Sequence, residues 1–135
     1  MGKGFSPVQR QIVAGRNHIP VCLIEAVAEV DAGDILGRTE MRLSGYELFE
    51  EIRLKQAEAT IELVHRFLDS YPTVHREKQT GPSSFYERRT EADDELDADQ
   101  SIRDQFNHFR IADNHRFPLH FSIDGHRYYL NVSKA

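Results

Sequence analysis

Residues 44–70, SGYELFEEIRLKQAEATIELVHRFLDS, have the pattern of one long helix. A capping box opens it, because the Ser44 hydroxyl can accept a hydrogen bond from the Glu47 N–H while the Glu47 carboxylate reaches back to Ser44. Tyr71-Pro72 closes it, since proline has no N–H and moves its predecessor out of the α region. At about 1.5 Å per residue, this helix would span roughly 40 Å.

The apolar side chains of this segment cover an unusually wide surface. At about 100° per residue they spread over roughly 200° of the helix, whereas a helix on a protein surface usually buries about 100°. One neighbouring element cannot cover such an arc. We therefore expect the segment to be a long central helix, packed between two elements or against a second subunit of a homodimer. The apolar positions are Ile52, Leu54, Ala57, Ala59, Ile61, Leu63, Val64, Phe67 and Leu68.

Length and composition predict a single globular domain over residues 1–135, with 39% hydrophobic and 29% charged residues. The net charge of −5 argues against a general nucleic-acid binder, which normally carries a basic excess. No apolar run reaches the roughly 18 residues of a membrane span, and no signal peptide opens the chain. Because Cys22 is the only cysteine, no intrachain disulfide can form, and we expect a cytoplasmic location.

The segment 20–43 fits two structures. Pro20, the alanines that follow it, and Glu25 and Glu29 at i,i+4 favour a nearly buried helix over 20–30. The alternation around Val27 fits a strand as well, with Asp31-Ala-Gly-Asp34 as the turn of a hairpin and a second strand over 35–43. We favour the helix, and the hairpin stays open. Upstream, Ser6-Pro7 predicts a short helix that stops at Gly15.

Two further segments separate the long helix from the C-terminus. Residues 72–90 are rich in turn formers and charges, and they predict a mobile loop that carries the aromatic pair Phe85-Tyr86. Residues 91–99 are strongly acidic, and we interpret them as the start of a helix that runs to about Ile111, because carboxylates complement the helix dipole. A calcium loop is excluded, since its glycine and its terminal glutamate are missing.

The C-terminus carries a hairpin signal over 117–132. Asp124-Gly125 between alternating runs predicts a two-residue turn. The resulting register places one apolar face on the core and one polar face outside. The apolar face is formed by the pairs Ile123–His126, Phe121–Tyr128, Leu119–Leu130 and Phe117–Val132. The polar face carries His120, Ser122, Arg127, Tyr129 and Asn131. With the long helix and its shorter flanking helices, this hairpin predicts an α+β fold.

No motif in the sequence supports a catalytic site. Gly-x-Ser-x-Gly and glycine-rich phosphate loops are absent, so no cofactor is expected. Glu62-Leu-Val-His65 has the Glu-x-x-His spacing of di-iron bundles, but it occurs once and on the polar side of its helix, so no metal is expected either.

The leading hypothesis is therefore a regulatory module, an inhibitor or adaptor that binds another protein of unknown identity. The acidic helix ridge, the aromatic pair and the polar hairpin face would make the contacts. The proposed partner-binding residues are Glu51, Glu58, Glu62, Asp69, Phe85, Tyr86, His120, Arg127 and Tyr129.

Two alternatives remain. The first is a small enzyme or metal-dependent protein that uses the histidine-rich C-terminus, His115, His120 and His126, with Arg127 and Tyr129, since imidazole binds several transition metals. The second is DNA binding through a helix-turn-helix over 7–30. It is disfavoured because Glu25 and Glu29 would face the phosphates.

Overall fold

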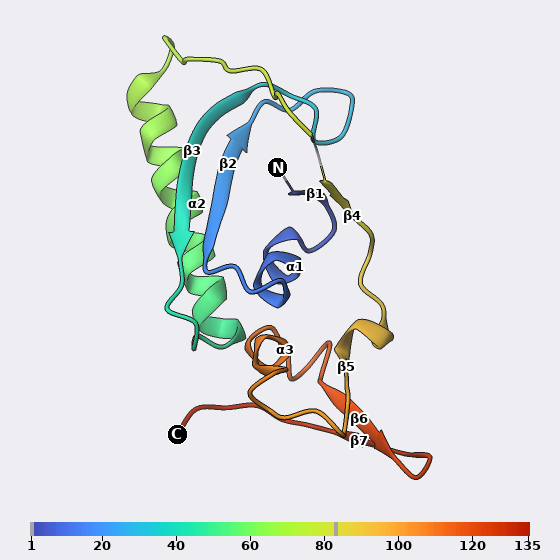
Figure 1. Cartoon of the computed structure of the whole chain (residues 1–135). Helices are drawn as coiled ribbons and strands as arrows, with labels where there is room; N and C mark the ends of the chain where they lie inside the picture. The colour runs from blue at the N-terminus through green and yellow to red at the C-terminus, as the bar shows by residue number, and fades with distance from the viewer. Residues whose placement is uncertain (1, 83) are drawn as a thin grey trace.

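The computed structural model describes residues 2–82 and 84–135, and its fold is mixed α+β, as predicted (Figure 1). In chain order the elements are β1 (Gly2–Gly4), α1 (Pro7–Val13), β2 (His18–Ile24), β3 (Ile35–Arg42), α2 (Phe49–Ser70), β4 (Ser84–Tyr86), the 3₁₀ helix η1 (Glu91–Asp94), β5 (Glu95–Leu96), α3 (Phe106–Arg110), β6 (His120–Ile123) and β7 (His126–Tyr129).

The helix favoured for residues 20–30 is wrong, because this segment belongs to an antiparallel hairpin. β2 and β3 pair from His18↔Arg42 to Ile24↔Ile35. Pro20 fits there, because β2 has only one partner strand in the described part of the chain and the missing N–H leaves no gap in a second ladder. Among residues 2–48, α1 is the only helix, so the helix-turn-helix interpretation is wrong as well.

The long helix α2 begins at Phe49, five residues later than predicted. Glu47 does reach back, but its carboxylate accepts from the Ser44 and Gly45 N–H groups in a turn that precedes the helix. The carboxylate of Glu51 accepts from the Leu48 N–H at 2.8 Å and satisfies the first turn. Tyr71 ends the helix, as predicted.

The central position expected for α2 is not confirmed. The helix lies along the outer side of the β2–β3 hairpin (Figure 1). Ile52, Ala59 and Leu63 are its buried apolar residues, whereas Leu54 and Leu68 are more than 60% exposed. The apolar arc is thus only partly covered within this chain.

The main core lies between α1, the β2–β3 hairpin and α2. Ile12 and Ile19 are fully buried in it, and Ile52 is 2% exposed. A second, smaller core is built from Leu96, Ala112 and Leu119. The two cores meet near α3, where Ile111 belongs to the main core and Ala112 to the smaller one.

The C-terminal hairpin has the predicted register, with Phe121 opposite Tyr128 and Ile123 opposite His126. β5 pairs with β6 in parallel and completes a three-stranded sheet. The predicted division into a buried and an exposed face is wrong in part. Ile123 and Tyr128 are about half exposed, whereas His120, placed on the polar face by the pattern, is 1% exposed.

The helix predicted from residue 91 to about Ile111 is also wrong. Only η1 and the five-residue α3 are helical there. Between them, Asp97 Oδ1 accepts from the Asp99 N–H, and the Gln105 side chain bonds to the backbone of Asp97. Such side-chain bonds to the backbone compete with helix formation.

Of residues 72–90, expected to be a mobile loop, the described parts 72–82 and 84–90 lie between the end of α2 and the opposite edge of the molecule (Figure 1). A β-bridge joins Ile35 to Glu77, and β4 pairs in parallel with β1, with Lys3 opposite Phe85. The described part of the chain contains no helix that is long and apolar enough to cross a membrane.

Candidate functional site

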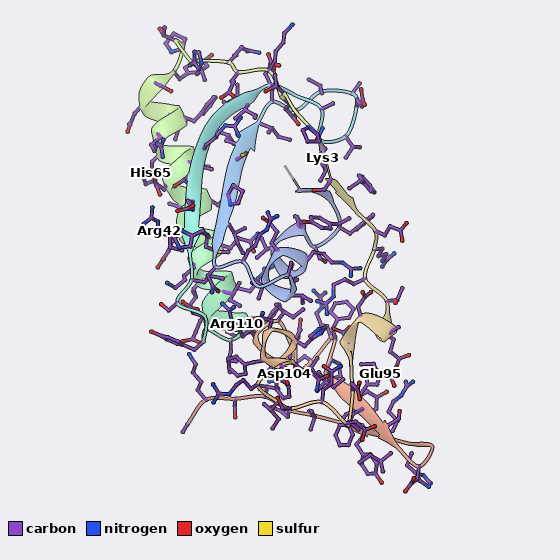
Figure 2. The ribbon with its side chains drawn as sticks, viewed as in Figure 1. Lys3, Arg42, His65, Glu95, Asp104 and Arg110 are labelled. Atoms are coloured by element: carbon purple, nitrogen blue, oxygen red, sulfur yellow. The ribbon has the colours of Figure 1, made fainter. Side chains whose placement is uncertain are left out.

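A pocket of about 250 Å³ lies between the N-terminal segment, β2 and the loop that joins β2 to β3. Asp31 lines it from the loop, and Lys3 and Gly4 from β1. Val8 and Gln11 line it from α1. Figure 2 shows Lys3 beside the loop that follows β2. The pocket thus joins residues that lie far apart in the sequence.

The backbone holds Asp31 in an unusual conformation. Its φ of 57° lies in the left-handed region, where aspartate is tolerated better than most residues but still at a cost of roughly 1 kcal/mol. Its Oδ2 atom accepts from the Gly4 N–H at 3.4 Å. A second segment of the chain thus contacts this residue, and residues with such rare backbone conformations cluster at functional sites.

The side chain of Gln79 bonds to the backbone of the same loop. Its Nε2 atom donates to the Asp31 carbonyl oxygen at 2.9 Å and to the Gly33 carbonyl oxygen at 2.6 Å. Gly33 is buried, and a Cβ atom there would lie 1.9 Å from the Glu25 carbonyl oxygen, so only glycine fits. The two hydrogen bonds from Gln79 and the close packing of Gly33 on Glu25 therefore hold this loop in place, although it has no regular secondary structure.

The rest of the wall is mostly apolar. Val8 is buried, and Gln11, which is 5% exposed, donates from Nε2 to the Pro7 carbonyl oxygen. Pro20 and Cys22 contribute from β2. The charged groups that line the pocket are the Asp31 carboxylate and the Lys3 ammonium. A lone carboxylate in such a site can accept a proton from a bound amine, and the ammonium can bind an acceptor oxygen.

The residues predicted from the sequence do not form this pocket. On α2, Glu51 pairs with Lys134 at 2.5 Å, Glu62 pairs with Arg66 at 2.9 Å, and both pairs are exposed. Glu58 and Asp69 are exposed on the same helix. Phe85 is exposed on β4, and the Tyr86 carbonyl oxygen accepts from the Phe5 N–H.

The hairpin residues are at the opposite end of the molecule from the loop that carries Asp31 (Figure 1). Arg127 pairs with Glu91, and the Tyr129 hydroxyl lies 3.5 Å from the same carboxylate. His120 is buried against the Tyr129 ring. The structure therefore does not bring the predicted residues of α2, β4 and the hairpin into one site.

The histidine-rich C-terminus is not gathered into a cluster of ligand-type side chains among the described residues. Residues 2–82 and 84–135 contain no group of three or more His, Cys, Asp or Glu side chains that could hold a metal ion. His120 is buried, whereas His115 and His126 are exposed.

Sequence reasoning missed Asp31, Lys3 and Gln11. One signal was available, because Asp31-Ala-Gly-Asp34 is the turn of the hairpin alternative. A turn that combines aspartate with glycine marks positions that tolerate a left-handed backbone. Nothing in the sequence indicated that residue 4 would meet this turn, because that contact spans 27 residues of chain.

No family model matches the chain. Among curated proteins it is similar to the methionyl-tRNA formyltransferase of Francisella philomiragia, with 25% identity over 108 residues that make up 80% of this chain. The enzyme of the same name from Sulfurihydrogenibium sp. is 26% identical over 111 residues. The chain spans about a third of the length of these relatives, 35% and 36%.

Solved structures with the same fold include enzymes with related names. The methionyl-tRNA formyltransferase from Clostridium thermocellum matches with a TM-score of 0.74 at 21% identity, over 93% of this chain and 55% of the other. A 4-N formyltransferase from Francisella tularensis matches with a TM-score of 0.79 at 16% identity, over 97% and 57%. HypX from Aquifex aeolicus, solved with tetrahydrofolic acid, gives 0.78 at 16% identity, over 93% and 22%.

These matches correct the leading hypothesis from the sequence. The hypothesis of an inhibitor, adaptor or regulatory module is contradicted. The proteins that are similar in sequence and those that are similar in fold are both named formyltransferases.

Proposed function

We propose that this chain forms part of a formyltransferase, and that the pocket around Asp31 receives the amine that becomes formylated. The observation that carries the proposal is Asp31, whose backbone is left-handed and whose carbonyl oxygen accepts from Gln79. Its carboxylate accepts from the Gly4 N–H in a pocket with mostly apolar walls. The names of the similar enzymes support formyl transfer as the reaction class.

The chemistry needs a proton acceptor. The amine nitrogen attacks the formyl carbon, a new C–N bond forms, and the bond from that carbon to the carrier breaks. The attacking nitrogen must lose a proton, and the leaving group of the carrier gains one. In our proposal the Asp31 carboxylate takes the proton from the amine, and the Lys3 ammonium binds a polar group beside it.

The likeness to HypX, which was solved with tetrahydrofolic acid, makes a formylated tetrahydrofolate the proposed donor. A volume of about 250 Å³ lies below the range of roughly 300–1,000 Å³ of sites that enclose drug-sized ligands. The pocket therefore fits the reacting amine end of the acceptor and not the whole carrier. The proposal names no residue of this chain that binds the formyl carrier.

The test is a formyl-transfer assay with the purified protein. Formyl-tetrahydrofolate is supplied with methionyl-tRNA or with an amino sugar, the acceptors that the names of similar enzymes indicate, and the formylated amine is measured by mass spectrometry. We expect Asp31→Asn to lower kcat at least 100-fold, because the amide cannot accept the proton. Asp34→Asn is the matched control, since Asp34 is in the same loop but outside the pocket lining, and it should stay within twofold of wild type.

Two results would contradict the proposal. One is the absence of formyl transfer to either acceptor by the wild-type protein. The other is an Asp31→Asn variant that keeps wild-type kcat with both acceptors.

A further inference from the structure

After α2 the chain returns to the loop that joins β2 to β3, and residues 76–79 run along that loop (Figure 1). The backbone contact is a β-bridge. The Ile35 N–H donates to the Glu77 carbonyl oxygen at 2.8 Å, and the Glu77 N–H donates to the Ile35 carbonyl oxygen at 2.9 Å. An ion pair between Arg76 and Glu25, at 2.5 Å, joins the same two segments. The position of residues 76–79 relative to the loop is therefore fixed by the backbone and by side chains.

Gln79 uses both hydrogens of its side-chain amide on this loop. Its Nε2 atom lies 2.9 Å from the Asp31 carbonyl oxygen and 2.6 Å from the Gly33 carbonyl oxygen, and a primary amide has one N–H for each. The Oε1 atom is buried and has no hydrogen-bond partner within residues 2–82 and 84–135. The reverse orientation would place Oε1 against two carbonyl oxygens. The surroundings therefore select Gln79 as a donor to the loop.

These two hydrogen bonds act on the backbone conformation of Asp31. Because the peptide unit is planar, the direction of a carbonyl group is set by the backbone angles of its own residue. Asp31 has a φ of 57°, and a non-glycine residue keeps such a conformation only where its surroundings fix it. Gln79 supplies that restraint at the carbonyl group of Asp31 and again at Gly33.

The carboxylate of Asp31 has its own fixed contact on the other side. Its Oδ2 atom accepts from the Gly4 N–H, and β4 fixes Gly4 in turn. A Cβ atom at Gly4 would lie 2.4 Å from the Tyr86 carbonyl oxygen, which also accepts from the Phe5 N–H at 3.0 Å. Asp31 is thus restrained at two points, at its carbonyl group by Gln79 and at its carboxylate by Gly4.

We propose that Gln79 is a positioning residue that keeps the Asp31 carboxylate in the pocket and on the Gly4 N–H. Asp31 lines the pocket and Gln79 does not, so Gln79 acts through Asp31 without touching the acceptor. A catalytic group displaced by about 1 Å can lose on the order of 100-fold in rate. The catalytic consequence rests on the proposed function, whereas the placement of the carboxylate by Gln79 does not.

The kinetic experiment uses Gln79→Met in the formyl-transfer assay described above. Methionine is about as long as glutamine and has no hydrogen to donate, so both carbonyl oxygens lose their partner. We expect kcat to fall about tenfold and the KM for the acceptor amine to stay within about threefold, because the lining of the pocket is unchanged. The matched control is Lys78→Met, the same replacement at the exposed neighbouring residue, which should leave both constants within about twofold.

A second readout needs no substrate. The amide N–H signal of Gly4 in an NMR spectrum reports its hydrogen bond to Asp31, and Asp31→Ala gives the position of that signal without the bond. Gln79→Met should move the Gly4 signal towards that position, whereas Lys78→Met should leave it where the wild type has it. A glutamine that only stabilised the fold would not move this signal in the folded protein.

Thermal melting establishes that each variant is folded. If Gln79→Met does not fold, Gln79→Glu takes its place. It has the same shape, and its ionised carboxylate cannot donate, so the same changes in kcat and in the Gly4 signal are expected.

The proposal is overturned if a folded Gln79 variant keeps the wild-type kcat, or if kcat falls while the Gly4 signal stays at its wild-type position. If the wild-type protein transfers no formyl group, the proposed function fails separately. The Gly4 signal alone then decides, because a shift supports the positioning role of Gln79 and an unchanged signal overturns it.

Discussion

The two interiors of this molecule differ in chemistry. The main core, between α1, the β2–β3 hairpin and α2, is built from apolar side chains such as Ile12, Ile19 and Ile52. The smaller C-terminal interior has three buried apolar residues and also encloses His120 and Asp94. Both ring nitrogens of His120 are buried without a hydrogen-bond partner among the described residues. The first interior is stabilised by apolar burial, whereas the second also encloses polar groups, of which Asp94 is paired with Arg89 and His120 has no partner in the described part of the chain.

Arg110 lies where these interiors meet, and it is 1% exposed (Figure 2). Its Nη1 atom donates to Asn17 Oδ1 at 2.9 Å and to Asn107 Oδ1 at 3.1 Å, and its Nη2 atom lies 3.4 Å from Glu47 Oε2. Burial lowers the pKa of Arg110, and the charge of Glu47 opposes that change. The junction is therefore a buried ion pair with neutral amides around it.

The largest effect on stability is expected from Arg110→Ala. The variant leaves Glu47 buried without its guanidinium partner, and loss of one member of a buried pair costs about 3–5 kcal/mol. Urea unfolding measures the difference in free energy of unfolding. Arg103→Ala, at an exposed position, is the control and should change it by less than 0.5 kcal/mol, a rough bound for surface sites. A loss below about 1 kcal/mol in Arg110→Ala would show that the junction contributes little.

A smaller and pH-dependent effect is expected from Glu47→Gln. Burial raises the pKa of Glu47, but hydrogen bonds from the Ser44 and Gly45 N–H groups and the charge of Lys55 lower it to about 2, against an ordinary 4.5. Because the folded pKa is depressed, the ionised carboxylate stabilises the protein above pH 4.5, and this stabilisation is lost as the pH falls towards 2.

At pH 7 this substitution should therefore cost about 3 kcal/mol. The difference between wild type and variant should shrink at pH 3, which urea unfolding at both pH values tests. A difference that stays constant between pH 7 and pH 3 would rule out ionisation of Glu47 as its source.

The smallest effect is expected in the apolar core. Ile19→Val removes one methylene from a fully buried side chain, which costs about 1 kcal/mol. Since no titratable group is involved, the cost should be the same at pH 7 and pH 3. Were it to change with pH as that of Glu47→Gln does, the distinction between the two interiors would be wrong.

Local patterns predicted some elements well. The turn at Asp124-Gly125 fixed the register of β6 and β7, because a two-residue turn leaves only one pairing. The stop at Tyr71 and the short helix α1 after Ser6 also follow from proline chemistry. In residues 20–30 the spacing of the apolar side chains fits a helix and a strand equally well. The structure shows a strand there, because residues 18–24 pair with residues 35–42.

The candidate sites could not be predicted in the same way. The acidic residues of α2 recur on one face of the helix, which is visible in the sequence, but in the structure Glu51 and Glu62 pair with Lys134 and Arg66. Asp31 is a single carboxylate, and the sequence Asp31-Ala-Gly-Asp34 predicts a turn there but no site. Its pocket exists because Gly4 and Gln79, which come from other segments, bond to its loop.

The sequence by itself determined the α+β class, the extent of α2 to within five residues at its start, and the C-terminal turn, because caps, prolines and period act over a few residues. Only the tertiary structure decided that 18–42 is a hairpin, that His120 is buried, and that Asp31 lines a pocket with residues of the N-terminal segment. Those features depend on contacts between distant segments, and their free energy comes from burial and long-range pairing that no local pattern records.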